Sequence, residues 1–477
     1  VLRRGVFSKN YIVKKFDGYL EYILDHERDI DKFEEKDLER FSTFLRLVRA
    51  FTAEFKKDLI SLRGGLYISI YQAAGNSIRR VGDITTGFEA RAFNPEKIFH
   101  LPETINRVVK ILRRKLQSAF IVIDAIRNPY EARFFRERYS AFYLVSINAP
   151  HQDRTAYLQK VHKFTVDQLK EMDEVESGKS GYSDNALVTQ NVKRCIELSD
   201  IHLFNPRNEL DNSNILRAQL SWYVSLMMHP GLISPTGMER VMQIAYAAKM
   251  NSGCISRQVG AVVTDQDNSI KAVGWNDVPS GQVPCSLRSL DGLLFGFDKE
   301  IYSEYEREND KFRSRAKEVF FQLKASDDAL SGRPKAYCFK DIHNSLDGKE
   351  NQVHTRSLHA EENAFLQLTK YGSAGIKGGR LYTTASPCEL CSKKAYQLGI
   401  KEVIFIDPYP GIARQHVLSN GTSPPVLTQF RGAVGKGYHQ LYEPTLSYKD
   451  ELRFFMKEDP TKKKEVEGES EKGKSSK

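Results

Sequence analysis

The sequence predicts an α/β protein built from two domains, and three observations support this prediction. The chain has 477 residues, which is too many for one hydrophobic core of ordinary size. Apolar residues make up 40% of it and aromatic residues 11%, which is typical of globular proteins with packed cores. Short apolar runs alternate with helical patterns in both halves, as expected where helices cover a sheet.

The first domain is predicted at residues 1–215. From Asp31 to about Arg80, apolar residues recur at helical spacing among charged ones, which indicates helices. Three short apolar runs are separated by charged helical stretches and predict buried strands of a parallel sheet: Ala119–Asp124, Phe142–Asn148 and Asp200–Phe204. A linker is predicted at residues 216–237, because proline and glycine punctuate Pro230–Gly237.

The second domain is predicted at residues 238–456, beginning with an amphipathic helix, Met238–Met250. Its predicted strands are Val259–Thr264, Ile270–Trp275, Arg380–Thr384 and Glu402–Asp407. Further helices are expected from His359 and from Cys388, and a polar, charged insertion occupies about residues 284–356. The lysine-rich stretch at 457–477, which also contains glycine and serine, predicts a disordered charged tail.

Composition argues against several protein classes. The longest apolar runs fall far short of the ~20 residues that span a bilayer, so no membrane partner is expected. Residues 1–10 lack the apolar region of a secretory signal, and the six cysteines are unevenly spaced for a disulfide scaffold, which favours a cytoplasmic location. The net charge of +10 permits binding of phosphates or nucleic acid, although acidic residues are interspersed almost everywhere.

Two short motifs in the second domain predict a metal site. His359 opens one expected helix, and Pro387-Cys388-Glu-Leu-Cys391 opens another directly after a strand. The dipole and free N–H groups of a helix N-terminus favour a thiolate there, and Cys388 and Cys391 are spaced to face the same side. With the imidazole of His359 they can bind one Zn²⁺ and leave a fourth position for water.

Glu361 is the predicted catalytic residue. Zinc lowers the pKa of bound water to about 7, but attack on an amino-substituted ring carbon also needs a group that moves protons. A carboxylate beside the metal can take the water proton and return protons to the ring nitrogen and the leaving amine. The pattern H-x-E…P-C-x-x-C is the signature of zinc-dependent nucleobase deaminases. A non-catalytic binding module with a closed structural zinc is the alternative.

These motifs and their surroundings resemble the cytidine and deoxycytidylate deaminase superfamily. The resemblance extends to Ser256-Arg-Gln-Val-Gly260, Gly274-Trp-Asn276-Asp-Val-Pro279 and Leu381-Tyr-Thr-Thr-Ala-Ser-Pro-Cys388. It implies a three-layer α/β/α cytidine-deaminase-like domain, one catalytic zinc, and free deoxycytidine nucleotides as substrates.

Three substrate contacts follow from the resemblance. Asn276 lies where the family places an asparagine that hydrogen-bonds the sugar. Arg257 is a candidate phosphate contact, with an ordinary surface arginine as the alternative. Tyr409, just beyond the last predicted strand, either lines the same pocket or packs against the domain.

The whole arrangement resembles the two-domain anti-phage nucleotide deaminases of bacteria, in which a P-loop kinase-like α/β domain comes first. Phe120-Ile-Val-Ile-Asp124, Val145-Ser-Ile-Asn148 and Asp200-Ile-His-Leu-Phe204 carry this resemblance. It implies deamination of dCTP and dCMP, which depletes a precursor of phage replication. The P-loop sequence itself is absent, because Glu176-Ser-Gly-Lys-Ser180 lacks the first glycine and a preceding strand. That segment is predicted to be a surface loop, and no kinase or ATPase activity is assigned.

Other possibilities stay open at this point. The alternative activity is deamination of a flipped base in RNA or single-stranded DNA, and the net positive charge of the chain supports it. The absence of a basic stripe interleaved with aromatic residues opposes it. A second, structural zinc near Cys285, Cys338, His343 and His354 competes with ordinary thiols, since the spacing is not tight. A homo-oligomer is expected, and the family resemblance suggests a regulatory nucleotide or inhibitory RNA.

Overall fold

A computed structural model gives the fold. It describes residues 38–63, 65–115, 119–162, 164–177, 187–206, 213–296, 299–323, 330–349, 354–372, 375–407 and 414–457. Residues 458–477 of the predicted tail, Tyr409 and the glycine–lysine–serine end of the P-loop-like segment lie outside these ranges. No helix in the described ranges is long and apolar enough to span a membrane.

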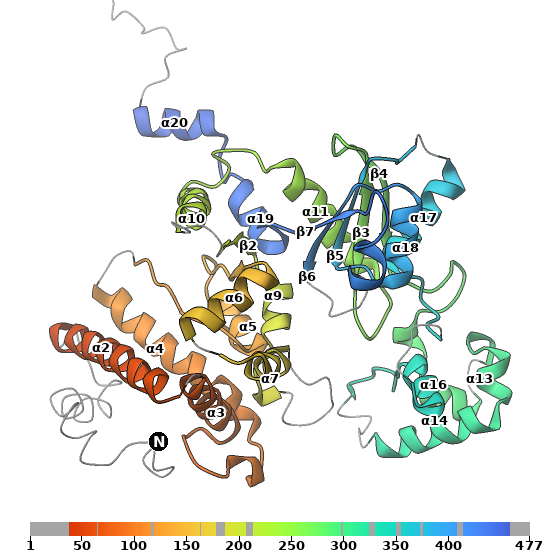
Figure 1. Cartoon of the computed structure of the whole chain (residues 1–477), viewed down its shortest axis with the longest axis horizontal. Helices are drawn as coiled ribbons and strands as arrows, with labels where there is room; N and C mark the ends of the chain where they lie inside the picture. Colours follow the sequence, from red (N-terminus) through yellow and green to blue (C-terminus); the bar gives the residue numbers. More distant parts are fainter. Residues whose placement is uncertain are drawn as a thin grey trace, which may run out of the picture.

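The first half of the chain is mainly helical, as the periodicity around residues 31–80 predicts (Figure 1). Its helices are α2 (Leu38–Leu62), α3 (Leu66–Val81), α4 (His100–Lys115), α5 (Pro129–Arg138), α6 (His151–His162), α7 (Val166–Ser177), α9 (Val192–Leu198) and α10 (Ser213–Met228). Short 3-10 turns occur at Phe88–Ala90 and Pro95–Phe99. Local sequence explains where α5 begins. Asn128 is its N-cap residue, whose Oδ1 accepts a hydrogen bond from the N–H of Tyr130 at 2.9 Å, and proline occupies the first helical position.

A three-stranded sheet lies among these helices. β1 (Val145–Asn148) runs parallel to β2 (Ile201–Phe204), as expected for the second and third apolar runs. β8 (Gly432–Ala433), from the far end of the chain, pairs antiparallel with β2. The strand predicted at Ala119–Asp124 is wrong: the segment has no regular structure, and the side chains of Phe120 and Val122 are 81% and 92% exposed. An apolar run becomes a strand only where a neighbouring strand pairs with it and a core covers it, and here neither occurs.

The predicted linker is helical over its first half. α10 covers all of residues 216–228, and its Tyr223 and Leu226 are buried against Ile201 and Leu203 of β2. Only the stretch around Pro230 is irregular, because proline and glycine stop the helix there. The domain boundaries and the P-loop kinase-like topology of the first half stay predictions.

The second half contains a five-stranded sheet of order β4-β3-β5-β6-β7. Its strands are β3 (Gly260–Thr264), β4 (Ile270–Trp275), β5 (Arg380–Ala385), β6 (Glu402–Asp407) and β7 (Val426–Gln429). β3 is antiparallel to both β4 and β5, whereas β5, β6 and β7 are parallel. Four of these strands match the predicted ones to within a residue at either end.

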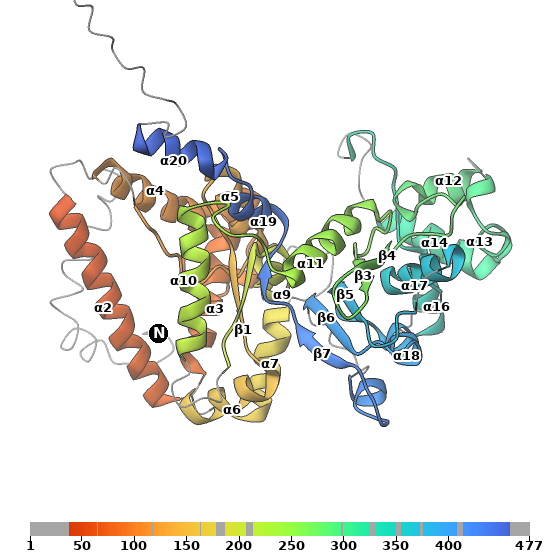
Figure 2. The ribbon, with the colours of Figure 1, turned by 90° about the horizontal axis from the view of Figure 1, so that it is seen from above.

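Helices cover both faces of this sheet, as a three-layer α/β/α arrangement requires (Figures 1 and 2). α17 (Ala360–Tyr371) and α18 (Glu389–Gln397) pack on one face, where Ala364 and Ala395 join a core with Val263 of β3. α11 (Gly237–Ala248) packs on the other, where Met242 joins Val262. The alternation of Val262 and Val263 between the two cores follows from the two-residue period of a strand.

The insertion forms a small helical unit with its own core rather than a purely polar segment. Its helices are α12 (Leu290–Phe295), α13 (Glu304–Glu308), α14 (Asp310–Gln322) and α16 (Phe339–Asp347), with 3-10 turns at Cys285–Leu287 and Lys299–Ile301. Leu293, Phe312, Val319 and Phe339 are among the side chains buried inside it. The composition of the insertion did not predict this core, because its apolar residues are distributed over several short helices among many polar ones.

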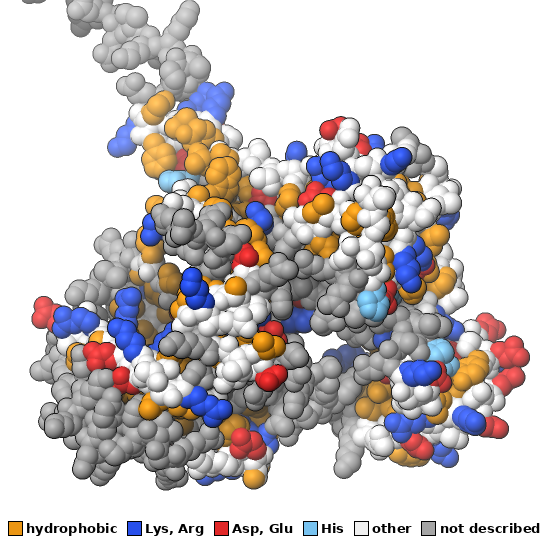
Figure 3. Space-filling model, viewed as in Figure 1, with side chains coloured by type: hydrophobic (Ala, Val, Ile, Leu, Met, Phe, Trp, Pro, Cys, Tyr) orange, Lys and Arg blue, Asp and Glu red, His pale blue; other side chains and the backbone are white. Residues whose placement is uncertain are grey.

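After β7 the chain returns to the first half through β8, α19 (Gly435–Tyr442) and α20 (Tyr448–Met456). Glu239 of α11 joins the two halves: its Oε1 accepts hydrogen bonds from the hydroxyls of Tyr223 at 2.9 Å and Tyr442 at 2.7 Å, and from the N–H of Ala433 at 2.9 Å. Phe454, Phe455 and Met456 of α20 are exposed, and Figure 3 shows hydrophobic side chains gathered over this helix.

Candidate active site

Two helix N-termini at the end of β5 bring the predicted metal ligands together. His359 is the N-cap residue of α17, and Cys388 is the N-cap residue of α18, with Cys391 in its first turn. His359 Nδ1 lies 3.2 Å from Cys388 Sγ and 3.5 Å from Cys391 Sγ. The ligand atoms of all three side chains lie within 4.8 Å of one another. Two motifs about thirty residues apart thus form one cluster.

The donor set and its spacing fit a zinc ion. Ligands at zinc distances of about 2.1 Å for nitrogen and 2.3 Å for sulfur lie about 3.6 Å apart when tetrahedral, close to the separations seen here. A hydrogen bond with Cys391 holds the pKa of Cys388 well below its ordinary value, which favours the thiolate that a metal needs. A hydrogen bond with Cys388 raises the pKa of His359. The three side chains leave one side of the cluster to the cavity that His359 and Cys388 line.

Glu361 lies beside this cluster without belonging to it. Glu361 is 4% exposed, and its Oε1 lies 3.1 Å from the hydroxyl of Thr383 on β5, whose single proton is shared with the carbonyl oxygen of Ala385 at 2.8 Å. Burial raises the pKa of Glu361 above the ordinary range of a carboxyl group. The close packing of α17 on β4 fixes its position, because a side chain at Gly274 would meet the carbonyl oxygen of Ala360 at 2.3 Å. Sequence reasoning missed Thr383, whose role depends on strand register.

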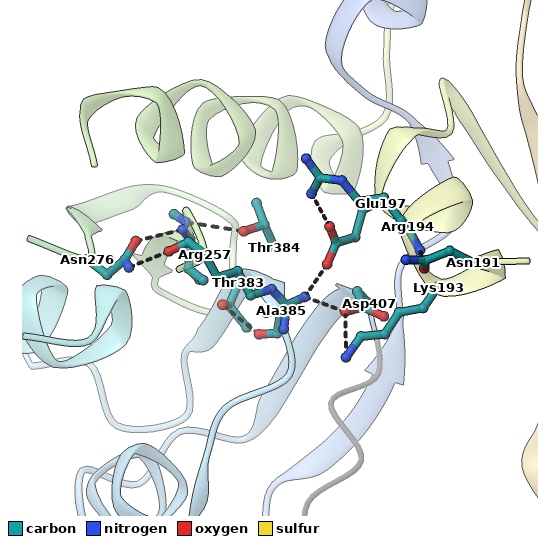
Figure 4. A network of polar contacts seen from close by, with 12 residues as sticks. Asn191, Lys193, Arg194, Glu197, Arg257, Asn276, Thr383, Thr384, Ala385 and Asp407 are labelled. Carbon is teal, nitrogen blue, oxygen red and sulfur yellow. Dashed lines mark hydrogen bonds and ion pairs between the residues drawn. The ribbon is translucent and has the colours of Figure 1, made fainter. Parts of the chain in front are cut away.

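Asn276 and Arg257 sit at the cavity, and both have internal partners. Asn276 Nδ2 donates to the carbonyl oxygen of Arg257 at 2.7 Å, and its Oδ1 accepts the N–H of Val259 at 2.7 Å. Asn276 therefore ties down the loop before β3 (Figure 4). The guanidinium of Arg257 pairs with Glu197 at 2.7 Å and with Asp407. The phosphate and sugar contacts predicted for these two residues stay predictions.

One cavity of about 320 Å³ connects these residues, a volume at the lower end for small-ligand sites. The helical insertion forms a wall of it that sequence reasoning did not assign. The lining residues from the insertion include Arg288, Lys340, His343, His354 and Arg356. The charged composition of residues 284–356 was the available signal, but it did not show which side chains turn inward.

The remaining predicted metal residues do not form a second centre. Within the described residues, no other group of three His, Cys, Asp or Glu side chains comes as close together as the first cluster. The rings of His343 and His354 stack at 4.6 Å, and Cys285 Sγ lies 4.0 Å from Ser357 Oγ.

Comparison with known proteins gives the family. The model of the "Cytidine and deoxycytidylate deaminase zinc-binding region" matches residues 235–407, which contain all of the residues placed above at the metal cluster and beside it. This segment belongs to the cytidine and deoxycytidylate deaminase superfamily. Zinc is accordingly its cofactor, and His359, Cys388 and Cys391 are the side chains in the described structure that could hold it.

Curated relatives agree with the family model. A deoxycytidylate deaminase of Enterobacteria phage T2 is 28% identical over 170 residues, which is 35% of this chain and 79% of the relative. A deoxycytidylate deaminase of Schizosaccharomyces pombe is 22% identical over 346 residues, covering 70% of this chain and 79% of the relative. The crystal structure of a cyanophage S-TIM5 dCMP deaminase with dCMP and dUMP is 24% identical, covers 42% of this chain and 99% of its own, and has a TM-score of 0.25.

Proposed function

We propose that this protein deaminates deoxycytidine nucleotides hydrolytically, converting dCMP or dCTP to the deoxyuridine nucleotide and releasing ammonia. One observation carries the proposal: a buried glutamate lies next to a histidine–dicysteine cluster, at the floor of a cavity of nucleotide-compatible size. The names of the curated relatives support dCMP as a substrate.

His359, Cys388 and Cys391 would hold the zinc ion, which when bound supplies a water activated for attack at neutral pH. Glu361 would take one proton from the attacking water and pass it to N3 of the cytosine ring. It would then pass the second proton of the same water to the departing amine, so that C4–N is exchanged for C4=O and ammonia leaves. The hydroxyl of Thr383, 3.1 Å from Glu361 Oε1, would help to hold this carboxyl group in place between the two transfers.

The cavity wall supports a phosphorylated substrate. Arg288, Lys340 and Arg356 of the insertion line the same cavity as Glu361, together with Glu306, which pairs with both arginines. The positive charge that remains after this pairing would attract a 5′-phosphate. We extend the proposal to dCTP, to depletion of the dCTP pool in anti-phage defence, and to a homo-oligomer in the cytoplasm, on the family resemblance alone.

The deciding experiment is an ammonia-release assay with product identification by mass spectrometry. Deoxycytidine, dCMP, dCTP, CMP and a cytosine-containing oligonucleotide are compared at equal cytosine concentration. Turnover of dCMP or dCTP above the others is expected. Turnover of the oligonucleotide alone would reject the proposal in favour of the polynucleotide deaminase.

A further inference from the structure

A partly buried cluster of charges joins α9 of the first half to the cavity of the second. The cluster consists of Lys193, Glu197, Arg257 and Asp407 (Figure 4). Asp407 ends β6, and its side chain is fully buried. Its Oδ2 contacts the guanidinium of Arg257 and lies 3.8 Å from Lys193 Nζ, whereas Oδ1 has no hydrogen-bond partner among the described residues. Burial raises the pKa of Asp407 to about 7 although Arg257 and Lys193 oppose this rise, so the charge of Asp407 depends on these two cations.

Glu197, which belongs to the first half of the molecule, forms an ion pair with the same guanidinium group of Arg257. Its Oε1 accepts a hydrogen bond from Arg257 Nη2 at 2.7 Å, and its other oxygen pairs with Arg194. Glu197 lies on α9, whose Cys195 is buried in the first half. Burial would raise the pKa of Glu197, but the neighbouring guanidinium groups of Arg257 and Arg194 outweigh it and lower that pKa. Glu197 is therefore ionised and available as a fixed anion.

Arg257 belongs to the loop that borders the cavity. Its carbonyl oxygen is held by Asn276, and both residues line the cavity together with His359 and Glu361. Asp407 also reaches the metal loop, because its carbonyl oxygen accepts the N–H of Ser386, two residues before Cys388, at 2.9 Å. The loop before β3 is thus fixed by Asn276 on one side and by two carboxylates on the other, one of which comes from α9.

We propose that Glu197 is a positioning residue for the nucleotide pocket: through Arg257 it lets α9 of the first half set the conformation of the loop before β3. This inference rests on the proposed function only where it is tested by enzyme kinetics. A merely structural ion pair would stabilise the fold without acting on the loop. The positioning role predicts that Glu197 acts on nucleotide binding, and only through Arg257.

Kinetics of Glu197→Gln in the full-length zinc-loaded protein test the first point. We expect KM for dCMP to rise about tenfold, the amount set by loss of one charge-assisted hydrogen bond, with kcat within about twofold. Glu197→Asp, which keeps the charge, should recover part of the loss. Glu137→Gln is the matched control, since Glu137 is an exposed glutamate on α5 paired with Arg133 at 2.6 Å. A rise in KM for the control equal to that for Glu197→Gln would overturn the proposal.

A double-mutant cycle tests the second point. In an Arg257→Gln background, Glu197→Gln should change KM no further, because the group through which it acts is gone. An undiminished effect in that background would show that Glu197 acts elsewhere and would overturn the proposal.

Hydrogen exchange on the full chain gives a readout that does not depend on activity. Glu197→Gln should speed amide exchange in residues 255–259, where the N–H of Val259 is bonded to Asn276, and Glu137→Gln should not. Unchanged exchange there would overturn the positioning role. If the wild type releases no ammonia from any deoxycytidine nucleotide, the proposed function fails, while faster exchange in Glu197→Gln would still support the positioning role.

Discussion

Each half of this protein carries a histidine among polar partners, His202 on strand β2 and His359 at the start of helix α17, and their surroundings shift the two pKa values in opposite directions. His202 of β2 is 1% exposed, hydrogen-bonds Ser146 Oγ at 2.8 Å through Nδ1, and packs edge-on against Phe430. Burial lowers its pKa to about 4. His359 lies at a cavity beside two thiols, and a hydrogen bond with Cys388 raises its pKa. The comparison shows that two features distinguish the histidine of a functional site from a histidine of the core: access to a cavity and the presence of neighbouring thiols. A hydrogen bond to a polar side chain does not distinguish them, because both histidines have one.

The largest effect is expected from removing a metal ligand. Cys391→Ala leaves two ligands for the ion, so bound zinc should fall from about one per chain to near zero after dialysis, with deamination lost. Zinc content by mass spectrometry and ammonia release are the measurements. Cys195→Ala is the control from the first half, because burial raises the pKa of Cys195 to about 12 and makes it an inert thiol. Stoichiometric zinc in the Cys391 variant would contradict the assigned ligands.

A smaller loss is expected when the proton carrier alone is removed. Glu361→Gln keeps the shape of the side chain but cannot accept the water proton, so kcat should fall by about 10²–10⁴ with zinc retained. Glu362→Gln is the neighbouring control: Glu362 pairs with Lys394 at the surface between α17 and α18, and its loss should leave kcat within about twofold. Equal kcat values for Glu361→Gln and the wild type would contradict the catalytic role of Glu361. They would favour the alternative, a non-catalytic binding module with a structural zinc.

The same two regions show what sequence can predict. The site was predictable because spacing at a helix N-terminus fixes which side chains within each motif share a side, and the signature H-x-E…P-C-x-x-C joins the two motifs. Thr383 and Asp407 were not, since their partners Glu361 and Arg257 come from other elements. The strand expected at Ala119–Asp124 failed for a related reason, because an apolar run carries no information about whether a neighbouring strand exists. Local chemistry was predictable, and contacts between elements were not.

The smallest expected effect concerns the stability of the first sheet in acid. The pKa of His202 is about 4 in the folded chain, below its ordinary value of 6.5, so the unfolded chain binds the proton first as pH falls. The stability contributed by the neutral ring is therefore complete above about pH 6.5 and is lost progressively down to about pH 4, by about 3.5 kcal/mol at roughly 1.4 kcal/mol per pKa unit.

His202→Asn isolates this contribution, because its amide can keep the bond to Ser146 but does not titrate. The variant should be less stable than the wild type at pH 7, and the difference should shrink toward pH 4. Urea unfolding followed by the fluorescence of Trp222 on α10, in a Trp275→Phe background, reports on the first half, since these are the two tryptophans of the chain. A pH-independent difference between variant and wild type would mean that His202 titrates alike in both states, and the contrast with His359 would then rest on access to the cavity alone.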